Sequence, residues 1–339
     1  EKLRKAKIPC PETGIEVKHT LCDICTPENH CGVDAYVLDG RVIKVEGTKE
    51  HPHNRGLLCT KGAANRDYIY REDRLKTPMR RVGKKGEGKF APITWEEAYD
   101  EITRRLTRIK EKDGPDSVAV FSGYPKWYRG LLKRFAYSFG TINYGTESAV
   151  CFDATMMACA ATMGAFCVPD LAHSGVHIGW GLSPHYTGYL SIQGLQARGG
   201  KLLIVDPKKT PLAAAADLHL QIKPGTDGAL ALGIARVIFE RGWQDQAYLD
   251  GYTLGLEEYR REVDKFDPAT VERITGIPPG QLEAAAELIA RHGPASLHQS
   301  ASPLTQHRNG FQNYRAILAL LAVTGSYDCP GGNFPLSFT

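Results

Sequence analysis

The stretch SGVHIGWGLSPHYTGYLSIQGLQARGGKLLIVDP, residues 174–207, decides the fold that we expect for this chain. It opens with an apolar run that ends in Gly-Trp-Gly and continues with a helical segment that two glycines stop. A second apolar run follows and ends at Asp206. A strand, a helix and another strand in this order are typical of two parallel strands joined by a crossover helix.

The same alternation continues on both sides of this stretch. A third strand is expected over 218–222, and a helix opened by Thr226 and Asp227 follows it. Upstream, a buried strand over 117–123 precedes a helix over 130–139. These elements predict an α/β fold with a doubly wound parallel sheet and helices on both of its faces. Sheets of this kind bind ligands at the carboxyl ends of their strands.

The amino-terminal part has a different character, with short strands and turns over 16–60. Two alternating runs flank an Asp-Gly turn within 35–47, which predicts a β-hairpin. Further on, Thr94 and Glu97 have the spacing of a capping box and predict a helix over 94–113, which a Gly-Pro pair ends. We therefore expect a small β-rich domain ahead of the α/β part.

Composition narrows the class of protein. The chain has 339 residues, of which 42% are hydrophobic, which suffices for two or three domains. A net charge of only +4 argues against a nucleic-acid binder. No apolar run reaches the roughly 18 residues of a membrane span, and the first residues show no signal peptide. We expect a cytoplasmic protein, while export by a removed twin-arginine signal stays open.

Nine cysteines occur in the chain, and four of them cluster near its amino-terminal end. Three lie in CDICTPENHC, residues 22–31, and the fourth lies in GLLCTKG. A zinc ribbon needs two close Cys pairs, whereas here three local thiols are accompanied by a single remote one. This arrangement favours a [4Fe–4S] cluster, with a structural zinc site as the alternative. The ligands would be Cys22, Cys25, Cys31 and Cys59.

Six segments, in collinear order over residues 18–334, resemble the molybdopterin-guanine-dinucleotide oxidoreductases of the dimethyl sulfoxide reductase superfamily. Each segment alone is a weak signal, and the shared order makes the resemblance specific. The segments are HPHNRGLLCTKG after the cysteine group, RLKTPMRRVG with FAPITWEEAYDEI, GWGLSP, LLIVDPKKT, ADLHLQIKPGTDGALALG, and LTQHRNGFQNYRAILALLAVTGSYDCPGGN.

Two features depart from the family pattern. Five residues separate the second and third cluster cysteines, where the family usually has three, so we expect the cluster loop to bulge. Members of the family are also about twice as long and end in a β-barrel domain that this chain lacks. We therefore expect a fragment or one piece of a split enzyme.

The resemblance implies a division into domains. It places an iron–sulfur domain at 1–80 and the first part of a discontinuous α/β domain at 81–145. An α/β domain that binds one pterin-guanine dinucleotide would cover 146–292. Residues 293–339 would return into the discontinuous domain.

The resemblance also implies three cofactors: one [4Fe–4S] cluster, molybdenum or tungsten, and a bis(molybdopterin guanine dinucleotide). Lys61 resembles the lysine that lies between cluster and pterin. Residues at strand ends, at a helix start and in one polar loop would bind the nucleotide and pterin. These are Gly179, Trp180, Gly181, Ser183, Asp206, Lys208, Thr210, Gly225, Thr226, Asp227, Gln306, His307 and Asn309.

Cys151 is the position that best matches the family's metal ligand, and Ser148 is the nearest oxygen alternative. A thiolate suits a soft metal centre that dithiolene sulfurs already hold. Formate oxidation is disfavoured because Phe152 stands where formate dehydrogenases have His. Thr26 stands where the acetylene hydratase branch has Asp.

The expected function is that of a molybdenum or tungsten oxidoreductase that exchanges electrons with an external iron–sulfur subunit. A sulfur compound of the polysulfide or thiosulfate type would be the substrate. Three alternatives stay open: an acetylene hydratase-like enzyme, a hydroxyarene dehydroxylase or transhydroxylase, and a non-catalytic electron-transfer subunit of the same fold. The missing part of a split catalytic chain is a further expected partner, and nucleic acid is not.

Overall fold

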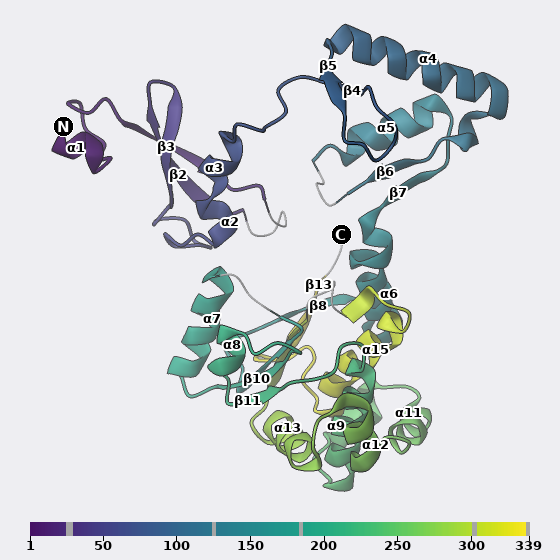
Figure 1. Ribbon diagram of the computed structural model, residues 1–339. Helices are drawn as coiled ribbons and strands as arrows, with labels where there is room; N and C mark the ends of the chain where they lie inside the picture. Colours follow the sequence, from purple (N-terminus) through teal and green to yellow (C-terminus); the bar gives the residue numbers. More distant parts are fainter. Residues whose placement is uncertain (25–29, 124–126, 183–185, 300–303, 337–339) are drawn as a thin grey trace. The chain divides into compact units, whose positions relative to one another are not determined.

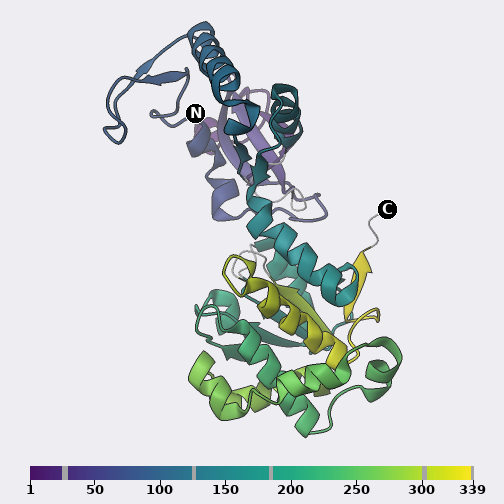
Figure 2. The same ribbon diagram turned by 90° about the vertical axis from the view of Figure 1, so that its right-hand side faces the viewer.

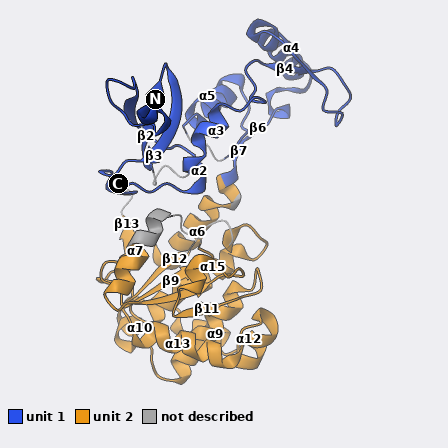
Figure 3. Ribbon diagram, turned by 60° about the vertical axis from the view of Figure 1, so that its left-hand side comes forward, with its two compact units in different colours: residues 1–147 blue, residues 148–339 orange. Residues whose placement is uncertain are grey.

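The structure is a computed structural model that describes residues 1–24, 30–123, 127–182, 186–299 and 304–336 (Figure 1). It divides into two compact units, residues 1–147 and 148–339 (Figure 3). The first unit includes everything up to Glu147, and the finer division at residue 80 stays a prediction. Within the described ranges, no helix is both long enough and apolar enough to cross a membrane.

The first unit begins with an antiparallel sheet of β1 (Glu16–Leu21), β2 (Gly32–Leu38) and β3 (Arg41–Gly47). The expected hairpin is confirmed: Asp39 and Gly40 both have positive φ, as a tight turn between twisted strands requires. Short helices accompany this sheet, namely α1 (Lys2–Lys5), α2 (Thr60–Ala63) and α3 (Asn65–Ile69).

The rest of the first unit contains the capped helix expected from the sequence. Thr94 caps α4 (Trp95–Asp113), and its capping box with Glu97 is complete. None of the α4 residues, which all lie in the described part, is buried; Trp95, Tyr99 and Ile102 are among its exposed apolar side chains. The remaining elements are β4 (Met79–Arg81) antiparallel to β5 (Phe90–Pro92), β6 (Val120–Ser122) parallel to β7 (Tyr144–Thr146), α5 (Arg129–Phe139), η1 (Pro115–Ser117) and η2 (Glu147–Val150), which leads into the second unit.

The second unit is built on a parallel sheet, which confirms the expected fold class. Its strands lie in the order β11 (Leu218–Leu220), β10 (Lys201–Val205), β9 (Val176–Trp180) and β12 (Ala295–Gln299). Two strands beside it, β8 (Phe166–Pro169) and β13 (Asn333–Leu336), pair antiparallel.

Helices cover both faces of this sheet. On one face, Ile178 and Leu203 pack with α9 (Asp227–Glu240), α13 (Pro279–Arg291) and α15 (Gly310–Val323). On the other face, Leu202 and Ile204 pack with α7 (Tyr186–Ala197) and α8 (Pro211–Ala214). Helix α15 runs beside α6 (Phe152–Met163) and α9 (Figure 2). The smaller helices are α10 (Gln246–Tyr252), α11 (Leu256–Val263) and α12 (Pro268–Thr275).

The described residues after Pro294 group with the second unit, and the expected return of 293–339 into a domain with 81–145 stays a prediction. Strand β12 pairs with β9 from Ala295 to Gln299, and α15 packs against α9, so this segment belongs to the second unit. The physical reason is that β12 satisfies its backbone donors and acceptors along β9 and buries Ala295 and Leu297.

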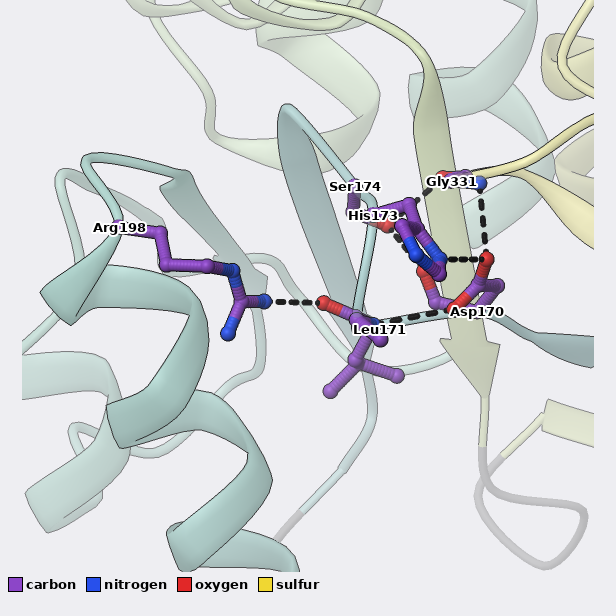
Figure 4. Close-up of polar contacts among 7 residues, drawn as sticks. Asp170, Leu171, His173, Ser174, Arg198 and Gly331 are labelled. Carbon is purple, nitrogen blue, oxygen red and sulfur yellow. Dashed lines mark hydrogen bonds and ion pairs between the residues drawn. The ribbon is translucent and has the colours of Figure 1, made fainter.

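A polar turn joins the β8–β9 connection to the segment before β13 (Figure 4). The Asp170 carboxylate accepts from the Gly331 N–H at 3.1 Å and lies 2.7 Å from His173 Nδ1. The Ser174 hydroxyl donates to the Gly331 carbonyl at 2.6 Å, and Arg198 donates to the Leu171 carbonyl. Burial by itself would raise the pKa of Asp170, but the hydrogen bonds from His173 and from the Gly331 N–H outweigh it and leave that pKa lowered.

Candidate functional site

Two of the four amino-terminal cysteines, Cys22 and Cys59, lie beside Gly62, and Cys31 pairs with Cys22 through the backbone. The Cys22 N–H donates to the Cys31 carbonyl at 2.8 Å, next to the paired ends of β1 and β2. Cys59 caps α2, and its sulfur accepts from the Gly62 N–H at 3.5 Å. A Cβ added to Gly62 would lie 3.8 Å from the Cys22 sulfur. Thiols from two separate segments therefore face one small space, as ligands of a shared cluster require. Cys25 lies outside the described residues.

Asn54 ties these two segments together, and the sequence analysis missed it. Its buried amide accepts from the Gly32 N–H at 2.8 Å and donates to the Gly32 carbonyl at 3.0 Å and to the Leu57 carbonyl at 2.8 Å. These bonds fix the chain before Cys59 against the start of β2. An asparagine in a polar loop carries no signal of such a role.

Among the described residues, no three His, Cys, Asp or Glu side chains gather closely enough to hold a single metal ion.

The remaining residue predicted in this unit is Lys61. It lies on α2, two positions after Cys59, and its side chain is exposed.

In the second unit, Cys151 stands at the start of α6. Its carbonyl accepts from the Thr155 N–H at 3.1 Å and from the Thr155 hydroxyl at 3.2 Å. The Thr305 hydroxyl also donates to this carbonyl, at 3.2 Å, across 154 positions of sequence. These bonds fix the backbone of Cys151 at the start of α6 and beside the segment that begins at Leu304. Ser148, the oxygen alternative, is buried, and its carbonyl accepts from the Cys151 N–H.

The other two cysteines near Cys151 are poorer candidates. Burial raises the pKa of the Cys159 thiol to about 12, and it also raises the pKa of Cys167. Both groups therefore stay protonated at neutral pH, and a protonated thiol is a weak metal ligand. Cys159 is 2% exposed and behaves as a small buried apolar residue.

At the carboxyl end of β9, Trp180 is completely buried. Its indole N–H donates to the Asp227 carboxylate at 2.8 Å, so the indole supports the site and does not face a ligand. A Cβ on Gly179 would come within 2.6 Å of Ile204 Cδ1, so a larger residue there would have to displace the Ile204 side chain. Gly181 has φ 60°, a conformation that glycine favours. Ser183 lies outside the described residues.

At the end of β10, Asp206 starts a tight turn. Its carboxylate accepts from the Lys208 N–H at 2.8 Å, and the Lys208 side chain is exposed. Thr210 caps α8 by accepting from the Ala213 N–H at 3.1 Å, so its hydroxyl has a structural partner already. We expected all three residues to bind the cofactor, and Thr210 in addition caps a helix.

An open cleft flanks this turn, lined by α8, β11 and the segment that leads into α13. Lys209, His219 and Gln221 contribute to its lining. The His219 ring lies 2.9 Å from the Asp206 carbonyl, and Gln221 donates to the Pro207 carbonyl at 3.0 Å. The cleft therefore adjoins the carboxyl end of β10, where ligands of parallel sheets bind.

The start of α9 faces the polar loop over 305–309. Gly225 has φ 81°, and Thr226 donates to the Lys223 carbonyl at 2.7 Å. Asp227 does not cap the helix; it is its first residue, and burial raises the pKa of its carboxyl. The free N–H groups at such a helix start favour an anion.

The polar loop reaches this helix start through Asn313, a second residue that the sequence analysis missed. Asn309 donates to the Asn313 amide oxygen at 2.9 Å, and His307 Nε2 lies 3.4 Å from the Asn313 amide nitrogen. Asn313 in turn donates to the Gly225 carbonyl at 3.2 Å. Gln306 is exposed. The sequence did offer one signal for Asn313: it is a polar residue on an otherwise apolar face of the expected helix.

Two family models match the chain. The family described as molybdopterin oxidoreductase matches residues 74–338, and the molybdopterin oxidoreductase Fe4S4 domain matches residues 15–71. These matches confirm the expected family and the expected cofactor classes, a molybdopterin with its metal and a [4Fe–4S] cluster.

Three similar proteins cover much of the chain. The probable oxidoreductase YoaE of Bacillus subtilis is 33% identical over 323 residues, which are 92% of this chain and 47% of the relative. A sulfite dehydrogenase subunit of Allochromatium vinosum is 34% identical over 252 residues, 72% of this chain and 26% of the relative. The structure of acetylene hydratase from Pelobacter acetylenicus superposes with a TM-score of 0.79 at 29% identity, over 94% of this chain and 44% of that one. The chain thus spans less than half the length of these proteins.

Proposed function

This chain belongs to the molybdopterin oxidoreductase family, and from that premise we propose that it is the amino-terminal, cofactor-holding part of a molybdenum or tungsten oxidoreductase. One [4Fe–4S] cluster would be held by Cys22, Cys25, Cys31 and Cys59 and would exchange electrons with the metal centre. Bis(molybdopterin guanine dinucleotide) would carry the metal.

One observation carries this proposal: a chain of contacts runs through the second unit. It joins Trp180 at a strand end to Asp227 at a helix start, and it joins Gly225 to the polar loop through Asn313. A strand end, a free helix amino terminus and a polar loop at one place form a suitable site for a phosphate-bearing ligand. Gly181, Asp206 and Lys208 lie at the ends of neighbouring strands of the same sheet.

Cys151 is the proposed protein ligand of the metal. Cys151 stands at the start of α6, and the Thr305 hydroxyl links its carbonyl to the polar loop. When bound, the metal–pterin group would supply the redox chemistry; the chain orients it and donates one sulfur. Lys61 would place a positive charge beside the cluster and stabilise added electron density.

A sulfur compound is the proposed substrate, supported by the similarity to the sulfite dehydrogenase of Allochromatium vinosum. An acetylene hydratase-like reaction is the second candidate, because a structure of that enzyme superposes on nearly the whole chain. Two further alternatives are a hydroxyarene dehydroxylase or transhydroxylase, and a non-catalytic electron-transfer subunit that lacks molybdenum.

We also propose two partners. The exposed apolar side chains of α4 and α5, such as Trp95, Tyr99, Leu131 and Phe135, would be covered by the part of the fold that the relatives carry beyond this span. An iron–sulfur subunit would accept or supply the electrons.

Analysis of protein purified without oxygen tests the proposed function. We expect about four iron and four sulfide per chain, as one [4Fe–4S] cluster requires, together with molybdenum or tungsten and a releasable pterin nucleotide. If the protein contains iron but no molybdenum, tungsten or pterin, the proposed enzyme is wrong and the electron-transfer alternative holds. Zinc in place of iron would contradict the cluster. Turnover of sulfite or thiosulfate against hydration of acetylene then separates the two substrate classes.

A further inference from the structure

Asn313 occupies an unusual position for an amide side chain. It lies in the first turn of α15 and is 2% exposed, on a helix whose other buried residues are mostly apolar. A buried amide destabilises the fold unless hydrogen bonds replace its contacts with water. The partners of Asn313 therefore indicate why the residue stands there.

These partners come from two segments that are distant in sequence. The amide nitrogen donates to the Gly225 carbonyl at 3.2 Å, just before α9, and its second hydrogen faces His307 Nε2 at 3.4 Å. The amide oxygen accepts from the Asn309 side chain at 2.9 Å. A reversed amide would put oxygen against the Gly225 carbonyl and nitrogen against the Asn309 nitrogen, so the surroundings fix its orientation.

Close packing supports the same arrangement. A Cβ on Gly228 would lie 2.6 Å from the Asn313 amide oxygen, so the glycine lets α9 approach α15 at this point. Similarly, a Cβ on Gly310 would lie 2.6 Å from the Thr305 backbone, so the glycine lets the loop lie close against the start of α15.

We propose that Asn313 is a positioning residue that holds the α9 start and the 305–309 loop together as one binding surface for the phosphate-bearing pterin cofactor. This inference rests on the proposed function. Through the Thr305 hydroxyl, the same loop also contacts the Cys151 carbonyl, so Asn313 links the anion-binding helix start to the proposed metal ligand. It acts through these segments, and no contact of its own with the cofactor is required.

Two substitutions test the proposal. Asn313→Leu has a similar volume and no hydrogen bonds, while Asn313→Asp keeps the acceptor for Asn309 and loses both donors. We expect the ratio of bound pterin to iron to fall about tenfold in both, as for the loss of one or two hydrogen bonds of this kind. Iron reports on the first unit and serves as an internal reference. Hydrogen exchange, followed by mass spectrometry, should become faster over both 222–230 and 304–312.

Asn333→Leu is the matched control. Asn333 is also 2% exposed, and its amide makes two 2.9 Å bonds with the Leu297 backbone, away from the loop. This variant should lower the melting temperature yet leave the pterin-to-iron ratio and exchange over 222–230 and 304–312 near wild type.

Three results would overturn the proposal: an unchanged pterin-to-iron ratio in Asn313→Leu, unchanged exchange in either segment, or an equal fall of the pterin-to-iron ratio in Asn333→Leu. If Asn313→Leu does not fold, Asn313→Asp provides the same comparison. A wild-type protein with iron but no pterin would remove the proposed function, and exchange alone would then decide whether Asn313 positions the two segments.

Discussion

The indole N–H of Trp180 donates a 2.8 Å hydrogen bond to the carboxylate of Asp227, 47 positions further along the chain. The indole is completely buried and Asp227 is 6% exposed, so the bond joins the end of β9 to the start of α9 inside the protein. Burial raises the pKa of Asp227, and the bond from Trp180 opposes that shift by stabilising the carboxylate.

Trp180→Phe should therefore destabilise the protein in a pH-dependent way. Because the folded-state pKa of Asp227 is raised, its contribution favours folding at low pH and is lost as the pH rises through that pKa. Removing the indole donor raises the pKa further. We expect the free energy of unfolding to fall by about 1–3 kcal/mol at pH 7, and by less near pH 4. Denaturant titrations at both pH values measure this.

Trp243→Phe is the control, since that indole lies beneath Arg291. For this variant, the decrease in the free energy of unfolding should not become larger between pH 4 and pH 7. If Trp180→Phe lowers the free energy of unfolding equally at both pH values, its effect does not depend on the charge of the Asp227 carboxylate.

Cys59→Ser should degrade the iron–sulfur cluster, because a hydroxyl is a poor replacement for a thiolate ligand at the position that faces Gly62. Iron should fall well below about four per chain, and the broad absorbance at about 400 nm should weaken. Cys10→Ser is the matched control, a cysteine of the same unit whose sulfur contacts Thr13. Wild-type iron and spectrum in Cys59→Ser would show that our ligand set is wrong.

Cys151→Ser should leave the pterin and the cluster bound but shift the X-ray absorption edge of the metal and lower the metal–sulfur count by one. Most of the activity should be lost. Cys159→Ser should do much less, because burial raises the pKa of that thiol to about 12 and keeps it protonated. If the Cys159 variant loses the sulfur and the Cys151 variant does not, the ligand assignment moves to Cys159.

His177→Gln should make the protein less sensitive to acid. His177 lies on β9, 1% exposed, with Nδ1 2.8 Å from the Ser296 hydroxyl. Burial and the nearby His298 lower its pKa to about 3. The unfolded chain therefore binds one more proton than the folded protein between about pH 6.5 and 3. As the pH is lowered across that window, the free energy of unfolding decreases by about 1.4 kcal/mol per pH unit.

Glutamine keeps a polar partner for Ser296 and does not titrate, so this slope should decrease by about one proton. Ser296→Ala keeps the imidazole and should retain the slope, with a lower stability at every pH. Equal slopes in wild type and His177→Gln would mean that His177 is not the group responsible.

Local patterns in the sequence determined the individual elements and the family. The Asp-Gly turn specified the hairpin of β2 and β3, the Thr94 and Glu97 spacing specified the start of α4, and glycine-bounded apolar runs specified β9 and β10. These features depend on neighbours within a few residues, so a single sequence contains them. The ordered motifs likewise predicted a molybdopterin family member with a cysteine-ligated cluster.

Tertiary structure alone decided how distant segments meet. It placed β12 beside β9, because backbone pairing and the burial of Ala295 and Leu297 depend on the whole sheet. It turned Trp180 inward onto Asp227, and it revealed Asn54 and Asn313 as amides that each bridge two segments. Such contacts join residues tens of positions apart, and their free energy depends on burial that no local pattern records.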